Sequence, residues 1–129
     1  MSNTPPELHR NMDEKKQALF KRGIDLFNRR EFFECHEVLE EIWTHARGPE
    51  RLFLQALIHF AVGFYHHQRR NREGAERQLH KGLKKIAAYL PEFEAVETAK
   101  LHTEVARRLK IIAGGGRVKG YPTIRMAKG

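Results

Sequence analysis

Apolar residues recur at helical spacing along most of the chain, and no segment shows the period-two alternation of a β-strand. The spacing predicts five helices, over about residues 11–28, 32–46, 49–70 and 71–90 and within residues 96–113. Gly48-Pro49 separates the second helix from the third, because proline is favoured in a first helical turn. The fold class is therefore expected to be all-α.

A weak internal repeat of 40 residues indicates that the first four helices form two hairpins. The repeat aligns Gly23, Arg30, Cys35 and Leu39 with Gly63, Arg70, Ala75 and Leu79. It resembles tetratricopeptide-type hairpins, whose period is nearer about 34 residues, but two units are too few for a solenoid. We expect a compact bundle of two helical hairpins and a closing C-terminal helix.

The length of 129 residues suits one domain with a single core. Residues 1–10, which contain Pro5-Pro6, are predicted to be a disordered lead-in, and residues 11–113 to be the helical domain. Gly114-Gly115-Gly116 should end the last helix, because glycine runs break helices. Residues 114–129 are then a basic tail, which we expect to be flexible.

Composition favours a soluble, cytoplasmic protein without membrane contacts. The N-terminal residues contain no apolar run of the kind found in signal peptides. The longest apolar stretch, residues 52–65, is shorter than the roughly 20 residues that a membrane span needs. Cys35 is the only cysteine, which excludes an internal disulfide.

The net charge of +8 is unevenly distributed. Residues 31–50 hold six acidic side chains and one basic one, whereas residues 114–129 hold four basic side chains and no acidic one. Residues 69–86 hold two acidic and seven basic side chains, namely Arg69, Arg70, Arg72, Arg77, Lys81, Lys84 and Lys85. This basic segment is a candidate nucleic-acid surface, although charged helix faces are most often simply solvated.

Two polar stripes are predicted to meet between the second and third helices. His36 and Glu40 share one helix face, and Gln55 and His59 share another, by the i, i+4 rule. The short connection at Gly48-Pro49 should make these helices antiparallel. His36 would then lie opposite His59, and Glu40 opposite Gln55, in one polar cluster.

The predicted cluster supports three interpretations. His36, Glu40 and His59 could bind a divalent metal, since two histidines and a carboxylate suffice for a site with open positions. The same residues could serve acid–base chemistry. The simplest interpretation is structural, because buried polar groups need hydrogen-bonding partners. Trp43 is a candidate pocket-lining residue or packs against the Arg47–Arg51 turn.

No residue is identified as catalytic and no cofactor is expected. Cys35 has no second cysteine or cationic activator near it in the sequence, so it is expected to be a core thiol. The glycines at 114–116 follow a helix and lack the Lys-Ser/Thr of a phosphate-binding loop.

A longer pattern, from Leu26 to Pro91, resembles the bacterial and archaeal family known as domain of unknown function 309. The matching residues are Leu26-Phe27-Asn28, Phe32-Phe33-Glu34, His36-Glu37, Leu39-Glu40, Trp43, Leu54-Gln55, Leu57-Ile58, Tyr65-His66, Asn71 and Gly74-Ala75. Arg30 and Arg70 stand where this family commonly has a turn glycine. The resemblance implies an all-helical domain and no established activity.

Together these patterns favour a non-enzymatic module that binds a protein or another ligand, with self-association included. The alternatives are an enzyme that uses the His36/Glu40/His59 cluster and a nucleic-acid-binding protein that uses the basic segment and tail.

Overall fold

The computed structural model describes the backbone of residues 6–127 and the side chains of residues 13–127. The helices are α1 (Pro6–Asn28), α2 (Phe32–His45), α3 (Pro49–Gln68), α4 (Arg72–Ile86) and α5 (Thr98–Ala113), with a 3-10 turn η1 (Ala87–Tyr89) after α4. Over the described residues there is no β-strand, only isolated bridges of Val96 with Phe93 and with Met126. The all-α prediction is confirmed.

Helix boundaries agree with the sequence pattern except at the N-terminus and at the end of the fourth helix, where α4 ends at Ile86 and η1 continues to Tyr89. The Asn71 side chain accepts a hydrogen bond of 3.0 Å from the Gly74 backbone N–H, and so caps α4. Helix α1 begins at Pro6, so residues 6–10 of the expected lead-in are helical, while residues 1–5 lie outside the described part. None of the described helices is both long and apolar enough to cross a bilayer.

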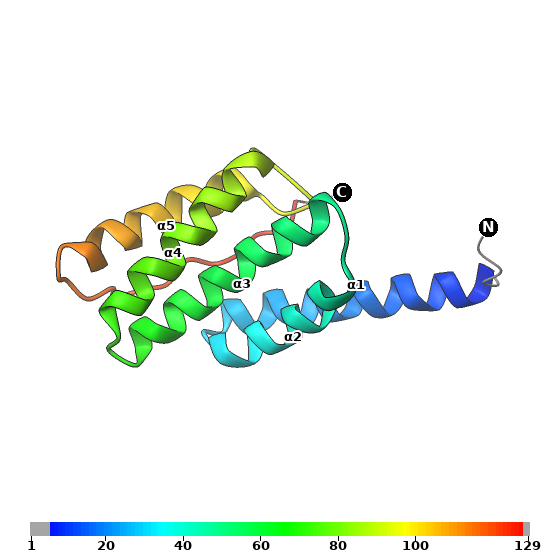
Figure 1. The fold of residues 1–129 in the computed structure, drawn as a ribbon, viewed down its shortest axis with the longest axis horizontal. Helices are drawn as coiled ribbons and strands as arrows, with labels where there is room; N and C mark the ends of the chain where they lie inside the picture. Colours follow the sequence, from blue (N-terminus) through cyan, green and yellow to red (C-terminus); the bar gives the residue numbers. More distant parts are fainter. Residues whose placement is uncertain (1–5, 128–129) are drawn as a thin grey trace.

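Helix α3 is the centre of the bundle. Figure 1 shows it between α2 and α4, with α1 beside α2 and α5 beside α4. Its buried residues surround most of its circumference, including Phe53, Leu57, Phe60 and Phe64. A helix that is apolar on most sides is expected to be enclosed by its neighbours.

The 40-residue repeat corresponds to two similar helix crossings. A Cβ atom added to Gly23 would lie 2.7 Å from Leu39 Cδ2, and one added to Gly63 would lie 2.7 Å from Leu79 Cδ2. The turns that precede α2 and α4 also match, since Arg30 and Arg70 have φ values of 66° and 62°. These left-handed conformations explain why glycine would suit both turns.

The C-terminal segment packs against the helices, unlike the flexible tail that the glycine run indicated. Ile124 is buried, and its backbone N–H and C=O bond to the Asn28 side chain at 2.7 and 3.0 Å. The Tyr121 ring lies 5.2 Å from Phe32 and 5.3 Å from Phe64 between centroids. Residues 121–124 therefore complete the core between α1 and α3.

His67 forms hydrogen bonds with the same segment, and these bonds require its neutral form. The Val118 backbone N–H donates to Nε2 at 3.3 Å, so Nδ1 carries the ring proton and faces the Tyr121 hydroxyl at 2.6 Å. Burial, and then the nearby Arg117 charge, lower the pKa of His67 below its ordinary value of 6.5.

Acidification is expected to weaken the fold through His67. The folded state binds this proton less readily than the unfolded state, so the contribution is complete above about pH 6.5 and is lost as the pH falls toward the lower folded pKa. Urea unfolding at pH 7.5 and 5.5 should show a smaller loss of stability for His67→Gln than for the wild type. Equal losses in the two proteins would contradict the assigned protonation state.

Candidate functional site

Helix α2 brings His36 and Glu40 together at the surface. His36 Nε2 lies 3.3 Å from Glu40 Oε1, and His36 Nδ1 lies 3.2 Å from the Phe33 carbonyl oxygen. Both ring nitrogens therefore face acceptor oxygens on the same helix. The i, i+4 pairing follows the sequence prediction.

His59 does not join this pair. Its Nδ1 lies 2.7 Å from Gln78 Oε1, so the ring faces α4 and not α2. Burial lowers the pKa of His59, and the Lys85 and Lys81 charges add to this effect, while the Gln78 hydrogen bond opposes it. The single polar cluster expected between α2 and α3 is therefore divided between two helix pairs.

The predicted metal set is likewise not assembled. Among residues 13–127, no three His, Cys, Asp or Glu side chains are grouped so that they could hold a metal ion. The reason is the register of α2 on α3: Phe33 stacks beside Tyr65, with ring centroids 5.3 Å apart, about one turn from the predicted alignment. Because α3 has a neighbour on each side, a polar residue on it can face either α2 or α4.

Trp43 contacts the turn after α2. The Arg51 guanidinium lies 3.9 Å from the Trp43 ring centroid, and Arg51 Nη1 donates to the Trp43 carbonyl oxygen at 2.9 Å. This is a cation–π contact of the kind that the Arg47–Arg51 alternative describes. The two cavities beside α1 are lined by other residues.

A continuous, partly exposed surface runs along α3. We call it the α3 face. Its members on α3 are half-buried, and α2 and α4 contribute a side chain row on each flank. By helical spacing from the Phe33–Tyr65 and His59–Gln78 contacts, we assign to the α3 face Gln55, His59, Val62, Tyr65 and His66, with Phe33, His36, Glu37 and Glu40 on α2 and Arg77, Gln78, Lys81 and Lys85 on α4.

Aromatic groups form one end of the α3 face. Phe33 is 48% exposed, which is close to the 50% of Leu52 on α3. Its ring lies 5.5 Å from His36 and 5.3 Å from Tyr65, and the Arg69 guanidinium lies 5.6 Å from the Tyr65 ring. Such half-exposed aromatic groups are typical anchors in protein interfaces.

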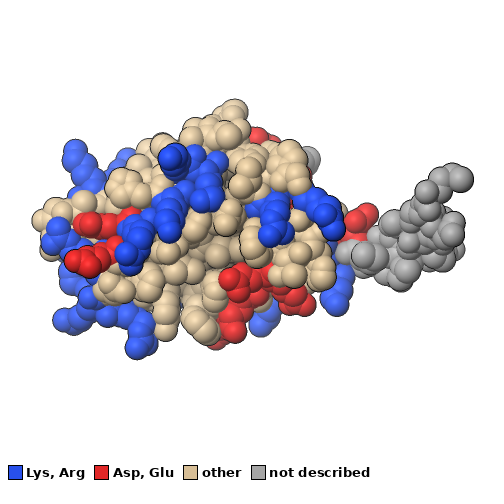
Figure 2. Space-filling model, in the orientation of Figure 1, with Lys and Arg blue, Asp and Glu red and all other residues tan. Residues whose placement is uncertain are grey.

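The two flanks of the α3 face carry opposite charge. Figure 2 shows Lys and Arg side chains in a band over α4 and acidic side chains gathered over α2, with mainly uncharged surface between them. Glu37 and Glu40 are exposed on the α2 flank, and Arg77 and Lys81 are exposed on the α4 flank. The face is therefore bipolar across the width of α3.

The basic residues predicted to contact nucleic acid do not form one uniform surface. Arg72 is held by Glu76 Oε1 at 3.2 Å and by the Ala113 carbonyl oxygen at 2.7 Å. Arg69 covers Tyr65, and Arg70 forms the left-handed turn before α4. Arg77, Lys81 and Lys84 are exposed, and Lys85 is half-buried.

Cys35 lies in the core, as its apolar surroundings predict. Burial raises the pKa of the Cys35 thiol to about 12. The thiol is thus protonated at neutral pH, whereas a cysteine nucleophile reacts as the thiolate.

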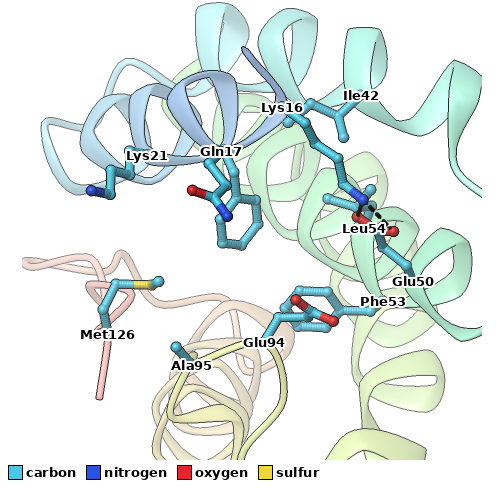
Figure 3. A pocket seen from close by; sticks show the side chains of 11 residues that line it. Lys16, Gln17, Lys21, Ile42, Glu50, Phe53, Leu54, Glu94, Ala95 and Met126 are labelled. Carbon is cyan, nitrogen blue, oxygen red and sulfur yellow. Dashed lines mark hydrogen bonds and ion pairs between the residues drawn. The ribbon is translucent and has the colours of Figure 1, made fainter. Parts of the chain in front are cut away.

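Sequence reasoning did not find the groove beside α1. Figure 3 shows its first part, a cavity of about 390 Å³ with Phe53 and Leu54 at its base and Met126 at its edge. A second cavity, of about 580 Å³, adjoins it at the ion pair of Lys16 and Glu50, which line both cavities. Lys16 Nζ lies 2.5 Å from Glu50 Oε1. The groove depends on the packed tail and on residues 94–95, far from α1 in sequence, so no local pattern indicates it.

These features define a small all-helical protein built from two hairpins, with a bipolar face along its central helix. Residues 20–78 match the family model described as "Domain of unknown function (DUF309)", which confirms the family resemblance. The match includes all of α2 and α3 and ends at Gln78, before Lys81, Lys84 and Lys85.

A curated relative is similar over part of its length. The chain is 36% identical over 75 residues to "Uncharacterized protein YpuF" of Bacillus subtilis (strain 168), which covers 57% of this chain. The match covers 41% of that protein, so the chain spans less than half the length of this relative.

Proposed function

We propose that this protein is a non-enzymatic binding module that docks a protein partner on the α3 face. The observation that carries the proposal is the bipolar charge of this face around the exposed Phe33 ring. A fitting partner presents acidic groups toward α4, basic groups toward α2 and an apolar contact for Phe33. Aromatic anchors supply affinity in such interfaces, and complementary charges fix the orientation.

The chemistry of the individual residues supports binding over catalysis. His36 and Glu40 pair on the α2 flank of the α3 face, and His59 is engaged with Gln78 on the α4 flank. The only thiol is buried and protonated. The histidine, glutamate and glutamine side chains give the α3 face hydrogen-bonding capacity. Because they are not grouped around one point, they favour binding over catalysis.

A protein suits the α3 face better than nucleic acid does. A phosphate backbone that bound Arg77 or Lys81 on the α4 flank and then crossed the α3 face would meet Glu37 and Glu40 on the α2 flank. Phosphates and carboxylates repel each other, whereas a protein surface can present both signs of charge.

Site-specific photocrosslinking tests this proposal. Phe33 is replaced by p-benzoylphenylalanine, which keeps an aromatic side chain, and Ile111 on α5, 42% exposed, is replaced as a matched control. We expect protein adducts in cells from position 33 and few from position 111. The protein captured in the adduct is then purified on its own. Its affinity for the wild type is compared with its affinity for the Arg77→Glu/Lys81→Glu variant.

The outcome decides the proposal as follows. Lower affinity of the charge-reversed variant for the purified adduct protein supports docking on the α3 face. Adducts of equal yield from the two positions, or none from position 33, would overturn it.

Nucleic acid is the second candidate, favoured by the exposed basic residues of α4. Arg77, Lys81 and Lys84 are exposed there, and a basic cavity of about 390 Å³ near the end of α5 includes Arg107 and Lys119. Labelled RNA and DNA should then bind with an affinity that falls steeply with salt, by about one logarithmic slope unit per phosphate contact. Absence of binding at low salt would end this alternative.

A further inference from the structure

The two flanks of the α3 face are complementary to each other. An acidic pair, Glu37 and Glu40, lies on α2, and a basic pair, Arg77 and Lys81, lies on α4. All four side chains are exposed, and within each pair they are separated by about one helical turn. The chain therefore carries both halves of a matched set of charges on a single surface.

The two pairs also lie at the same level along α3. On α2 the level is set by Phe33, which stacks beside Tyr65, and on α4 by Gln78, which contacts His59. Both outer helices run antiparallel to α3, as Figure 1 shows. Because the helices are antiparallel, each residue forward on α2 or α4 corresponds to one residue back on α3. Both charged pairs therefore lie beside residues 56–61 of α3.

From this arrangement we infer that the partner docked on the α3 face is a second copy of this chain, with α4 of each copy over α2 of the other. This inference rests on the proposed function. It deepens that proposal by naming the partner.

Symmetry selects one orientation for such a dimer. A two-fold axis that runs parallel to α3 between the two copies leaves each residue at the same level along α3. It places the α4 flank of each copy over the α2 flank of the other, so Arg77 and Lys81 of each copy meet Glu37 and Glu40 of the other. The two charged contacts are identical, as in an isologous interface. An in-plane axis perpendicular to α3 would instead place the basic α4 flanks on each other, and like charges would oppose it.

The same axis brings together apolar groups at the aromatic end of the α3 face. Val62 and Tyr65 of the two copies then lie near the axis, with Phe33 beside them. This apolar part adjoins the charged pairs, and specific interfaces usually combine apolar contacts with polar ones.

A charge-exchange experiment tests the dimer. One variant carries Arg77→Glu and Lys81→Glu, and a second carries Glu37→Lys and Glu40→Lys. The mass of each protein, and of their equimolar mixture, is measured by sedimentation over a range of concentrations at low salt. We expect a dimer for the wild type, monomers for each variant alone and a heterodimer for the mixture, because the mixture restores both attractive contacts.

A third variant controls for net charge. Lys100→Glu with Lys110→Glu on α5 changes the net charge by the same amount as the α4 variant, at exposed positions away from the α3 face. It should remain dimeric. Circular dichroism confirms that each variant keeps its helices, so that loss of the dimer is not loss of the fold.

Three results would overturn the inference: a wild type that is monomeric at every concentration, a mixture that remains monomeric, or dissociation of the α5 control. The failure of the proposed function itself is distinguishable from these. A monomeric protein that still forms adducts from position 33 with a different protein keeps the proposed function and removes only the second copy. A monomer without such adducts removes both.

Discussion

Replacing Ile124 with alanine is expected to lower the free energy of unfolding by about 3 kcal/mol, because buried Ile→Ala changes typically remove 2–5 kcal/mol. Ile124 is 2% exposed and lies where the C-terminal segment joins α1. The loss combines the transfer of apolar surface back to water with the cavity that remains. Urea unfolding monitored by circular dichroism measures it.

The neighbouring Thr123→Ala is the control. Thr123 is exposed, so its truncation should change stability by no more than about 0.5 kcal/mol. If Ile124→Ala were as mild as this control, the packed position of the C-terminal segment would be refuted.

Replacing Gly82 with alanine should lower stability by about 2 kcal/mol, from an overpacking cost at the upper end of its 1–3 kcal/mol range. An added Cβ would lie 2.5 Å from Phe60 Cε1 and 3.0 Å from the Ala56 carbonyl oxygen. The Phe60 ring is fully buried and the carbonyl belongs to the α3 backbone, so neither can move aside cheaply. The better helix propensity of alanine, about 1 kcal/mol, offsets only part of this cost.

Gly120→Ala serves as the control for Gly82→Ala, since a Cβ at position 120 meets no atom within 4 Å. Its thermal unfolding midpoint should stay close to that of the wild type. A Gly82→Ala protein as stable as the Gly120→Ala protein would show that α3 and α4 are not in such close contact.

Periodicity and local end signals were sufficient for the helices, and the 40-residue repeat indicated the two hairpins. The reason is that local signals act within a few residues: Asn71 caps α4, and Gly48-Pro49 begins α3. The repeat was also informative, because Gly23 and Gly63 mark two crossings where helices approach closely. Each of these residues affects its immediate neighbourhood.

The candidate site was predicted only in part, because periodicity does not say which neighbour a residue faces. His36 and Glu40 are on one helix, so their pairing follows from spacing. His59 belongs to a helix enclosed on several sides, and its contact with Gln78 depends on how α4 packs. The packing of the C-terminal segment was not predicted for a similar reason. It depends on hydrogen bonds between Asn28 and Ile124, which are 96 positions apart in the sequence.

The position of the C-terminal segment has a consequence for synthesis on the ribosome. Phe32 and Phe64 are translated well before residues 121–124, where Tyr121 packs against both rings in the finished structure. During elongation these aromatic side chains must remain uncovered until residue 124 has emerged. A nascent chain stalled before that point would display the apolar surface that chaperones recognise, even with all five helices already translated.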